Sequence, residues 1–232
     1  MSGLPRDILA RDIVAVVPVK DFSLAKQRLA GAFPPAFRRQ LAGAMLRDVL
    51  AALRAAEGLA GIVVVTADPE AGLLAREHGA RLLFEKEVRG LNAAVTEAAA
   101  RLAAEQRGGV LVLPSDIPAA TPGEIGRLLA AHGKGRAVSL VRAHDGQGTN
   151  ALVATPPDAL GFAYGPSSFE AHLANAAALG IVPRAHDAGA FSRLALDVDT
   201  PEDVARLGLL GAASHTRRLL EGAGLLPAGS AG

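Results

Sequence analysis

The chain of 232 residues contains no cysteine and no tryptophan, and its aromatic residues amount to 3%. Without cysteine the protein can form no disulfide, use no thiolate nucleophile and bind no zinc through thiolates. With so few aromatic rings it offers little surface on which nucleic-acid bases could stack. A net charge of +1 gives no general attraction to nucleic acid or to an acidic membrane. We therefore expect neither nucleic acid nor a membrane among its partners.

Several sequence signatures are also missing. No apolar run approaches the roughly 18 residues of a membrane-spanning helix, and the amino-terminal segment MSGLPRDILARD has no apolar signal core. We therefore expect a soluble, cytoplasmic protein. There is no GxxxxGK[ST] motif, no GxGxxG after the first apolar run and no GxSxG motif. These absences argue against a P-loop NTPase, a dinucleotide-binding fold and a serine hydrolase of the nucleophile-elbow type.

Half of the residues are hydrophobic, and 26 glycines and 14 prolines punctuate the chain, a composition typical of a globular protein. Over 13–142, apolar runs alternate with helical patterns, which predicts a mostly parallel central sheet with helices on both faces. Further strands are expected at 181–185 and 194–199. We expect a single α/β domain over 1–210. A weakly ordered tail over 211–232 should follow, after one or two helical turns.

The segment 13–29, IVAVVPVKDFSLAKQRL, is the stretch around which the predicted site is built. Its nearly continuous apolar half is typical of a buried parallel strand. Its polar half is then the loop at the carboxyl end of that strand, where open α/β sheets bind ligands. Lys20, Lys26 and Arg28 bring three cations to this loop, which favours a polyphosphate ligand. The alternative is an ordinary solvated loop of basic residues.

Two aspartates end the apolar run LALDVD at 194–199. If that run is a strand, Asp197 and Asp199 point to the same face, because side chains alternate along a strand. Two adjacent carboxylates repel one another unless a cation bridges them, and hard divalent cations prefer oxygen ligands. The alternative is that both are surface charges ahead of a helix that Thr200 caps and Pro201 begins.

A third acid, Asp116, ends the apolar run at 110–116. It is expected at the ligand-binding edge of the sheet, where it would complete a three-carboxylate Mg²⁺ site with the aspartate pair. The alternative is a turn, since Ser-Asp before proline commonly begins one.

Small residues make up two further loops, GQGTN at 146–150 and GPSS at 165–168. Such loops let the backbone approach a ligand closely, and the second precedes a helix whose free N–H groups favour an anion. A plain capping box from Ser167 to Glu170 explains the second loop equally well. The six histidines have no metal-binding spacing and are expected at the surface or at helix ends. His144 and His172, together with Arg142, differ only in lying near these loops.

Taken together, these segments resemble the guanylyltransferases of F-420 deazaflavin coenzyme biosynthesis, which belong to the GT-A-like nucleotidyltransferases with a three-layer, Rossmann-like α/β fold. Six segments carry the resemblance in order along nearly the whole chain: PVKDFSLAKQRL (18–29), GLNAA (90–94), LPSDIP (113–118), GTNAL (148–152), YGPSSFEAH (164–172) and LDVDTPEDV (196–204).

The resemblance implies a set of site residues. Lys20, Lys26 and Arg28, with Asp116, are the expected catalytic residues. The nucleotide GTP is expected at Pro18, Val19, Lys20, Lys26, Arg28, Leu91 and Asn92. The acceptor is expected at Thr149, Asn150, Gly165, Ser167 and Ser168, and Mg²⁺ at Asp116, Asp197 and Asp199. The resemblance also leaves room for a homodimer.

The expected reaction is in-line attack of an acceptor phosphate on the α-phosphorus of GTP, with release of pyrophosphate. A phosphate is already anionic at neutral pH, so no general base is required. The acceptor is a small phosphorylated acid, namely phosphoenolpyruvate, 2-phospho-L-lactate or 3-phosphoglycerate, among which the sequence does not choose. Two alternatives stay open: transfer to a sugar phosphate or molybdopterin, and GTP binding without catalysis.

Overall fold

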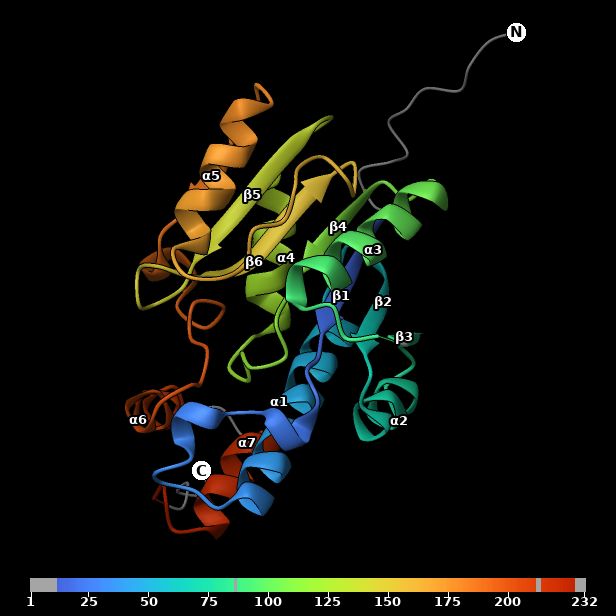
Figure 1. The fold of residues 1–232 in the computed structure, drawn as a ribbon. Helices are drawn as coiled ribbons and strands as arrows, with labels where there is room; N and C mark the ends of the chain where they lie inside the picture. The colour runs from blue at the N-terminus through green and yellow to red at the C-terminus, as the bar shows by residue number, and fades with distance from the viewer. Residues whose placement is uncertain (1–11, 86, 212–213, 228–232) are drawn as a thin grey trace, which may run out of the picture.

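The computed structural model describes residues 12–85, 87–211 and 214–227 (Figure 1). Its strands are β1 (Ile13–Pro18), β2 (Leu59–Thr66), β3 (Arg81–Phe84), β4 (Gly109–Val112), β5 (Ala137–Arg142), β6 (Thr149–Thr155) and β7 (Arg184–His186). Its α-helices are α1 (Pro35–Ala55), α2 (Pro69–Glu77), α3 (Leu91–Ala104), α4 (Pro122–Ala131), α5 (Ser168–Ala178), α6 (Pro201–Leu209) and α7 (His215–Gly222). Short 3-10 helices lie at Phe22–Leu24, Gln27–Leu29 and Ala188–Phe191.

The seven strands form one sheet in the order β3-β2-β1-β4-β6-β5-β7. The pairs of β1 with β2 and β4, of β2 with β3 and of β5 with β7 are parallel. Strand β6 is antiparallel to both of its neighbours, and its arrow in Figure 1 points opposite to that of β5. The predicted mostly parallel α/β sheet is confirmed, and one reversed strand is added to it.

Strand β1 is central and is buried along its whole length. Its side chains alternate between two apolar layers: Ala15 and Val17 pack with α1, α2 and α4, whereas Val14 and Val16 pack with α3 and α5. Burial on both faces explains why the sequence here is an unbroken apolar run rather than an alternating one. The prediction of helices on both faces is thereby confirmed.

A third apolar cluster lies beyond the carboxyl ends of the strands and includes residues of α1, α6 and α7; Figure 1 shows α7 beside the first turns of α1. Leu41 of α1, Leu207 of α6 and Leu220 of α7 pack there with Val198. This cluster buries the segment that leads to Asp199 and so fixes the backbone on which the aspartate pair is carried.

Helix α7 lies in the segment 211–232, where we expected one or two helical turns before a weakly ordered tail. The Asp48 carboxylate of α1 accepts hydrogen bonds from the backbone N–H groups of His215 and Thr216, at 2.7 and 2.9 Å. These two N–H groups open α7 and have no partner inside the helix. The helix is therefore anchored to α1. Residues 212–213 and 228–232 of that segment lie outside the described residues.

The strand expected at 194–199 is not formed, and the one expected at 181–185 is reduced to β7. In place of the former strand the chain makes a turn, with Ala195 N–H bonded to the Phe191 carbonyl, and then an extended stretch. Val198 N–H donates to the carbonyl of Asp116 at 3.0 Å. Leu196 and Val198 pack in the third cluster and Leu194 packs in the layer of α1 and α4, rather than pairing in the sheet, which a local pattern does not distinguish.

The helix start expected at Thr200 and Pro201 is found. Thr200 caps α6 in a capping box with Asp203, and Pro201 is its first residue. Thr121 caps α4 through its side chain. The carboxylate of Glu124, however, turns away to accept from the backbone N–H of Leu194 at 2.8 Å, which ties the turn before the aspartate pair to α4.

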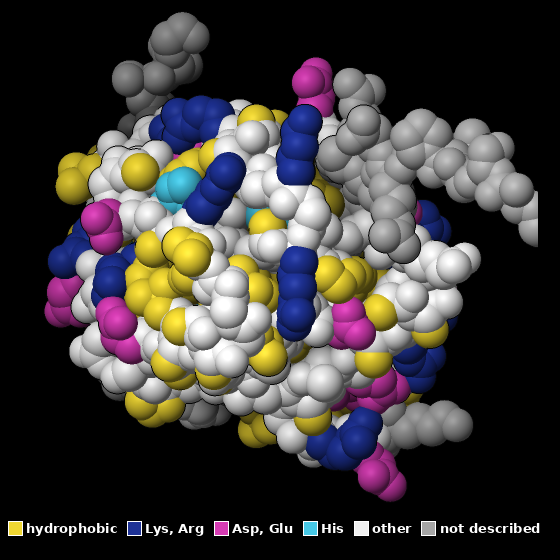
Figure 2. Space-filling model, turned by 90° about the horizontal axis from the view of Figure 1, so that it is seen from above, with side chains coloured by type: hydrophobic (Ala, Val, Ile, Leu, Met, Phe, Trp, Pro, Cys, Tyr) yellow, Lys and Arg dark blue, Asp and Glu magenta, His cyan; other side chains and the backbone are white. Residues whose placement is uncertain are grey.

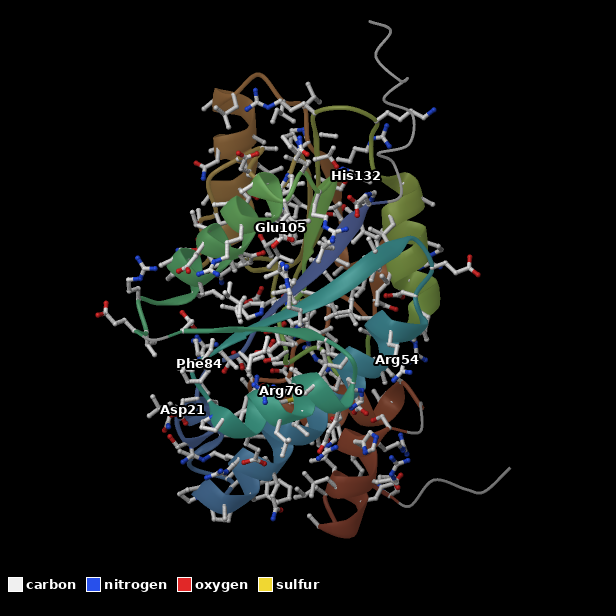
Figure 3. The ribbon with its side chains drawn as sticks, turned by 90° about the vertical axis from the view of Figure 1, so that its right-hand side faces the viewer. Asp21, Arg54, Arg76, Phe84, Glu105 and His132 are labelled. Atoms are coloured by element: carbon white, nitrogen blue, oxygen red, sulfur yellow. The ribbon has the colours of Figure 1, made fainter. Side chains whose placement is uncertain are left out.

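All strands except β6 end at one edge of the sheet, and β6 begins there. Figure 3 shows Phe84, the last residue of β3, and Asp21, in the loop after β1, at this same end. The order reverses between β1 and β4, the position where open α/β sheets bind ligands. Figure 2 shows the opposite end, on which Lys and Arg side chains are separated by hydrophobic and uncharged ones. No helix among the described residues is long and apolar enough to cross a membrane.

Candidate functional site

Lys26 joins the first loop to two of the predicted metal ligands. Its Nζ lies 2.8 Å from Asp116 Oδ2 and 2.8 Å from Asp199 Oδ1. The lysine side chain is only 5% exposed, while the two carboxylates keep 31% and 33% of their surface exposed. Burial, the largest influence, disfavours the ammonium form, but the two carboxylates outweigh it and raise the pKa of Lys26 above its usual range. In the same way Lys26 overcomes burial and lowers the pKa of Asp116.

The backbone of Lys26 adopts a left-handed conformation with φ of 54°, which non-glycine residues rarely take. The buried Arg38 of α1 donates from Nη1 to the carbonyls of Ala25 and Lys26, at 3.3 and 3.4 Å. Leu29, fully buried in the third cluster, anchors the following turn. Such conformations persist only where the surroundings impose them, and they concentrate at functional sites.

The other two cations of the loop are more open. Arg28 donates from Nη1 to Asp199 Oδ2 at 3.3 Å, and its side chain is 76% exposed. Lys20 is exposed and has no ion-pair partner among residues 12–85, 87–211 and 214–227. Its charge nevertheless contributes to the lowered pKa of Asp116. Pro18 and Val19, which precede it, are buried, and Val19 N–H is held by the carbonyl of Val65.

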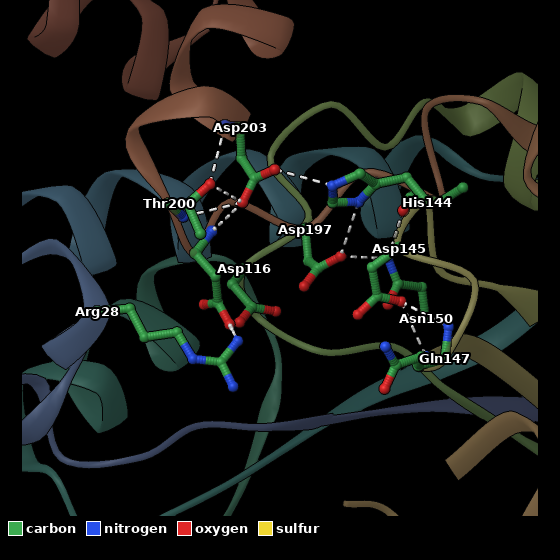
Figure 4. A network of polar contacts seen from close by, with 12 residues as sticks. Arg28, Asp116, His144, Asp145, Gln147, Asn150, Asp197, Thr200 and Asp203 are labelled. Atoms are coloured by element: carbon green, nitrogen blue, oxygen red, sulfur yellow. Dashed lines mark hydrogen bonds and ion pairs between the residues drawn. The ribbon is translucent and has the colours of Figure 1, made fainter. Parts of the chain in front are cut away.

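Asp197 belongs to a second polar group, with Asn150 and His144, as Figure 4 shows. Its Oδ1 accepts from Asn150 Nδ2 at 3.0 Å and lies 3.3 Å from His144 Nδ1. The other ring nitrogen, Nε2, lies 2.8 Å from Asp203 Oδ1. Burial and, next, the charge of Asp116 raise the pKa of Asp197. The charges of the three aspartates therefore influence one another, although only Asp116 and Asp199 contact the same atom.

Whether the predicted aspartate ligands fit Mg²⁺ depends on how many of their carboxylate oxygens converge. In the described part of the chain, no group of three or more His, Asp and Glu side chains could hold a metal ion. Two of the predicted ligands do converge, since Asp116 and Asp199 reach the same ammonium nitrogen. Proteins usually hold Mg²⁺ by one or two carboxylates, and substrate phosphates and water complete its octahedron. A pair of convergent aspartates fits that mode of binding.

The residues predicted for the acceptor fall into a buried and an exposed set. Thr149, Asn150 and Ser168 are at most 5% exposed. Ser168 Oγ accepts from Thr149 N–H at 2.9 Å, and Asn150 Nδ2 also donates to the carbonyl of Ala195 at 2.8 Å. Gly165 and Ser167 are exposed. The buried set joins the start of β6 to the start of α5, and the exposed set borders the open edge.

His172 completes the buried set. Its Nε2 accepts from Ala163 N–H at 2.9 Å, so in the neutral ring the proton lies on Nδ1 and is donated to Thr149 Oγ1, also at 2.9 Å. Burial lowers the pKa of His172 to about 4, so the ring is neutral at physiological pH. The Thr149 hydroxyl, used here as an acceptor, keeps its own proton for a second partner.

The capping-box alternative for 167–170 is not realised. Ser167 makes no side-chain cap, and Glu170 pairs instead with Arg142 at 3.0 Å. Two N–H groups at the start of α5 are already used, because Ser168 and Phe169 donate to loop carbonyls. The expected open helix N-terminus is therefore only partly available to an anion.

Asn92, predicted at the nucleoside, holds this loop in the structure. Its Oδ1 accepts from Tyr164 N–H at 2.7 Å and its Nδ2 donates to the Tyr164 carbonyl at 2.9 Å. The adjacent Leu91 is half-buried in the apolar layer of α3. The start of α3 is thus tied to the exposed acceptor loop.

Sequence reasoning missed three residues that organise the site: Arg38, His144 and Asp203. Asp203 lies in the first turn of the helix that Thr200 was expected to cap, yet its Oδ1 lies against His144 while its Oδ2 completes the cap. Arg38 lies in a helix whose pattern predicts only a core-facing stripe. The signal for His144 was its position two residues after β5, beside a glycine-rich loop.

Solved structures of other proteins share this fold. A nucleotidyl transferase from Methanothermobacter thermautotroptrophicus superimposes with a TM-score of 0.59 at 18% identity, over 90% of this chain and 98% of that one. A 4-diphosphocytidyl-2C-methyl-D-erythritol synthase does so with a TM-score of 0.60 at 16% identity, over 86% and 99%. The chain therefore has the fold of the nucleotidyltransferases, as predicted.

Sequence similarity is more specific. The model of the family described as guanylyl transferase CofC like matches residues 13–226. A protein of Rubrobacter xylanophilus named phosphoenolpyruvate guanylyltransferase is 40% identical over 206 residues, which cover 89% of this chain and 98% of that protein. The chain belongs to the CofC-like guanylyl transferase family, which confirms the resemblance drawn from its six segments.

Proposed function

We propose that the protein transfers GMP from GTP to the phosphate of phosphoenolpyruvate, with release of pyrophosphate, in the biosynthesis of coenzyme F-420. Family membership and the name of the Rubrobacter xylanophilus relative support guanylyl transfer and this acceptor. The observation that carries the mechanism is the contact of Lys26 with Asp116 and Asp199, because it joins a phosphate-binding loop to metal-binding carboxylates.

The triphosphate side of the site consists of Lys20, Lys26 and Arg28. Lys20 is the cation best placed to meet an incoming phosphate, since it is exposed and has no ion-pair partner in the described part of the chain. Arg28 is mostly exposed and held at 3.3 Å by one carboxylate, so it can turn to a phosphate at little cost. Pro18, Val19, Leu91 and Asn92 border the nucleoside in this proposal.

Asp116 and Asp199, with Asp197 beside them, are the residues that would hold Mg²⁺. The ion supplies charge stabilisation for the phosphates of the transition state. Of the acceptor residues, Gly165 and Ser167 are exposed and contact the phospho-acid directly. Thr149, Asn150 and Ser168 hold that loop against β6.

The reaction needs no protein base. An oxygen of the acceptor phosphate attacks the α-phosphorus of GTP and forms a new P–O–P bond, while the bond from the α-phosphorus to the bridging oxygen breaks. Pyrophosphate leaves with that electron pair. The work of the protein is to bring two anions together and to stabilise the leaving group, which matches a site built of cations and aspartates.

A coupled assay of pyrophosphate release tests the proposal. With GTP and Mg²⁺, phosphoenolpyruvate should give steady release, whereas a sugar phosphate or molybdopterin should give none. Silence with phosphoenolpyruvate, 2-phospho-L-lactate and 3-phosphoglycerate alike would reject the proposal. GTP binding without turnover in the same preparation would identify a non-catalytic binding protein instead.

The choice of acceptor is tested by competition. The three phospho-acids are mixed in equal amounts with GTP, and the products are identified by mass spectrometry. We expect the phosphoenolpyruvate adduct to dominate. A mixture dominated by another adduct would retain guanylyl transfer and replace the acceptor.

A further inference from the structure

Lys26 occupies a position of unusual chemistry. Its ammonium nitrogen is equidistant, at 2.8 Å, from one oxygen of Asp116 and one of Asp199, and its side chain is almost entirely buried. A divalent cation held by these same two oxygens would lie close to the same point, because Mg²⁺–oxygen distances are about 2.0–2.1 Å. An ammonium group and a divalent ion cannot share that point, since both sterics and like charge forbid it.

The arrangement lets the side chain leave without moving its loop. The loop backbone is fixed by Arg38, which donates to two of its carbonyls, and by the buried Leu29. The lysine ammonium is carried on a flexible four-carbon stem, so rotation of that stem is enough to release it. The same loop carries Lys20 and Arg28, so a released Lys26 remains beside the cations proposed to bind the triphosphate.

We propose that Lys26 is a positioning residue that alternates with the metal: its ammonium holds Asp116 and Asp199 together until a divalent cation takes its place, and it then turns to the triphosphate. This inference rests on the proposed function, which supplies the divalent cation and the triphosphate. Nucleotide and metal should then favour one another, because phosphates offer the displaced ammonium new partners, and such coupling is reciprocal.

The first test measures binding of Mn²⁺, used as a spectroscopic substitute for Mg²⁺, by electron paramagnetic resonance without nucleotide. In Lys26→Met the competing ammonium is gone, so Mn²⁺ should bind at least about tenfold more tightly than to the wild type. Arg28→Met is the matched control, because it removes a positive charge at the same Asp199 from a side chain that does not bridge the carboxylates. It should change the affinity by less than about threefold.

Two outcomes would overturn the proposal. One is an unchanged or weaker Mn²⁺ affinity in a Lys26→Met protein whose circular dichroism is that of the wild type. The other is an equal gain in Arg28→Met, which would reduce the effect to general electrostatics. Neither measurement of Mn²⁺ affinity uses the transfer reaction, so their outcome is independent of the outcome of the pyrophosphate assay.

A second test uses the wild-type chain, so that it holds even where Lys26→Met does not fold. Acetic anhydride labels accessible lysines, and mass spectrometry gives the rate at each site. Lys26 should react slowly without divalent ions and at least about fivefold faster at saturating Mn²⁺, whereas the exposed Lys134 should react equally in both. A rate at Lys26 that does not respond to bound Mn²⁺ would overturn the proposal.

Discussion

Asp199 forms ion pairs with two cations of the first loop, Lys26 at 2.8 Å and Arg28 at 3.3 Å. We predict that Asp199→Asn lowers kcat at least about 100-fold, because a neutral amide oxygen binds a divalent cation more weakly than a carboxylate and cannot balance these charges. The fold should persist, since the side chain is one-third exposed and does not cap α6. Pyrophosphate release and thermal unfolding measure the two effects.

The matched control for that variant is Asp187→Asn. The Asp187 side chain is 91% exposed and lies 3.7 Å from Arg142, outside the carboxylate group of the site. The Asp187→Asn variant should release pyrophosphate at close to the wild-type rate. Near-normal turnover in Asp199→Asn would remove Asp199 from the proposed metal ligands.

Figure 4 shows His144 between Asp197 and Asp203: its Nε2 lies 2.8 Å from Asp203 Oδ1, and its Nδ1 lies 3.3 Å from Asp197 Oδ1. Residues that orient ligands in this way are commonly worth 10–100-fold in activity or metal affinity. We predict that His144→Ala lowers kcat/KM by about that factor and raises the Mg²⁺ concentration needed for half-maximal rate. A purely structural role would lower stability without moving the Mg²⁺ requirement.

The control for His144→Ala is His215→Ala, because the His215 side chain is exposed and only its backbone contacts Asp48. Both variants are titrated with Mg²⁺ in the pyrophosphate assay. An unchanged Mg²⁺ requirement in His144→Ala would show that Asp197 does not depend on this ring.

At the scale of elements, α7 is attached through one carboxylate. Asp48 accepts from the first two N–H groups of that helix and is 8% exposed. We predict that Asp48→Ala lowers the free energy of unfolding by about 2 kcal/mol, the upper range for loss of a helix cap. Urea unfolding measures the change, and Asp158→Ala, at an exposed position, is the control.

The attachment also makes a local prediction. In Asp48→Ala, proteolysis should cut first within α7, because the freed helix loses its docking before the sheet unfolds. First cleavage at a site unrelated to α7, with no loss of stability, would contradict this account of how the helix is held.

Elements whose signals are local could be predicted from the sequence. The continuous apolar run of β1 reflects burial on both faces, and Thr200 followed by Pro201 marks the start of α6 by chemistry that needs no distant partner. The strand predicted at 194–199 is wrong because Leu196 and Val198 pack under α6 and α7, and Leu194 packs in the layer of α1 and α4, without pairing in the sheet. An apolar run shows that a segment is buried, but not in which layer.

In the candidate site, too, local features could be predicted from the sequence and long-range contacts could not. The types and approximate places of Lys26, Asp116 and Asp199 could be read from strand ends. Their contact could not, since it joins residues 90 and 173 positions apart and depends on a left-handed backbone at Lys26. His144 was missed because its partners come from segments 53 and 59 residues later, which only the third apolar cluster brings close.

At the scale of the whole molecule, stability should depend on pH through the half-buried His132 and the buried His172. Burial is the first cause in both: it lowers the pKa of His132 and of His172 from the ordinary 6.5 to about 4. The unfolded chain takes up these protons near pH 6.5 and the folded chain only near pH 4. The stabilisation gained by keeping these histidines neutral in the fold is therefore complete above pH 6.5 and is lost as pH falls toward 4. Between pH 7 and 5 the free energy of unfolding should fall by about 2 kcal/mol per histidine.

The measurement is urea unfolding at pH 7 and pH 5. His132 contacts Ser139 and Thr155 through its two ring nitrogens, at 2.8 and 3.0 Å, and His132→Gln should reduce the loss of stability by about half. His215→Gln, at an exposed position, should leave the loss unchanged. An identical loss in His132→Gln and the wild type would show that this histidine titrates normally in the fold.

The single reversed strand has a consequence for how such enzymes diverge. On the side proposed for GTP, the loops lead into helices that form the core, so a change in their length displaces a packed layer. On the side proposed for the acceptor, residues 143–148 are the tip of the β5–β6 hairpin. His144 is fixed there by Asp203, but the exposed residues 145–147 can vary in number while both strands stay in register. The acceptor half of the site can therefore change its shape more easily than the triphosphate half. Lineages that keep one nucleotide and exchange acceptors are the expected outcome of this topology.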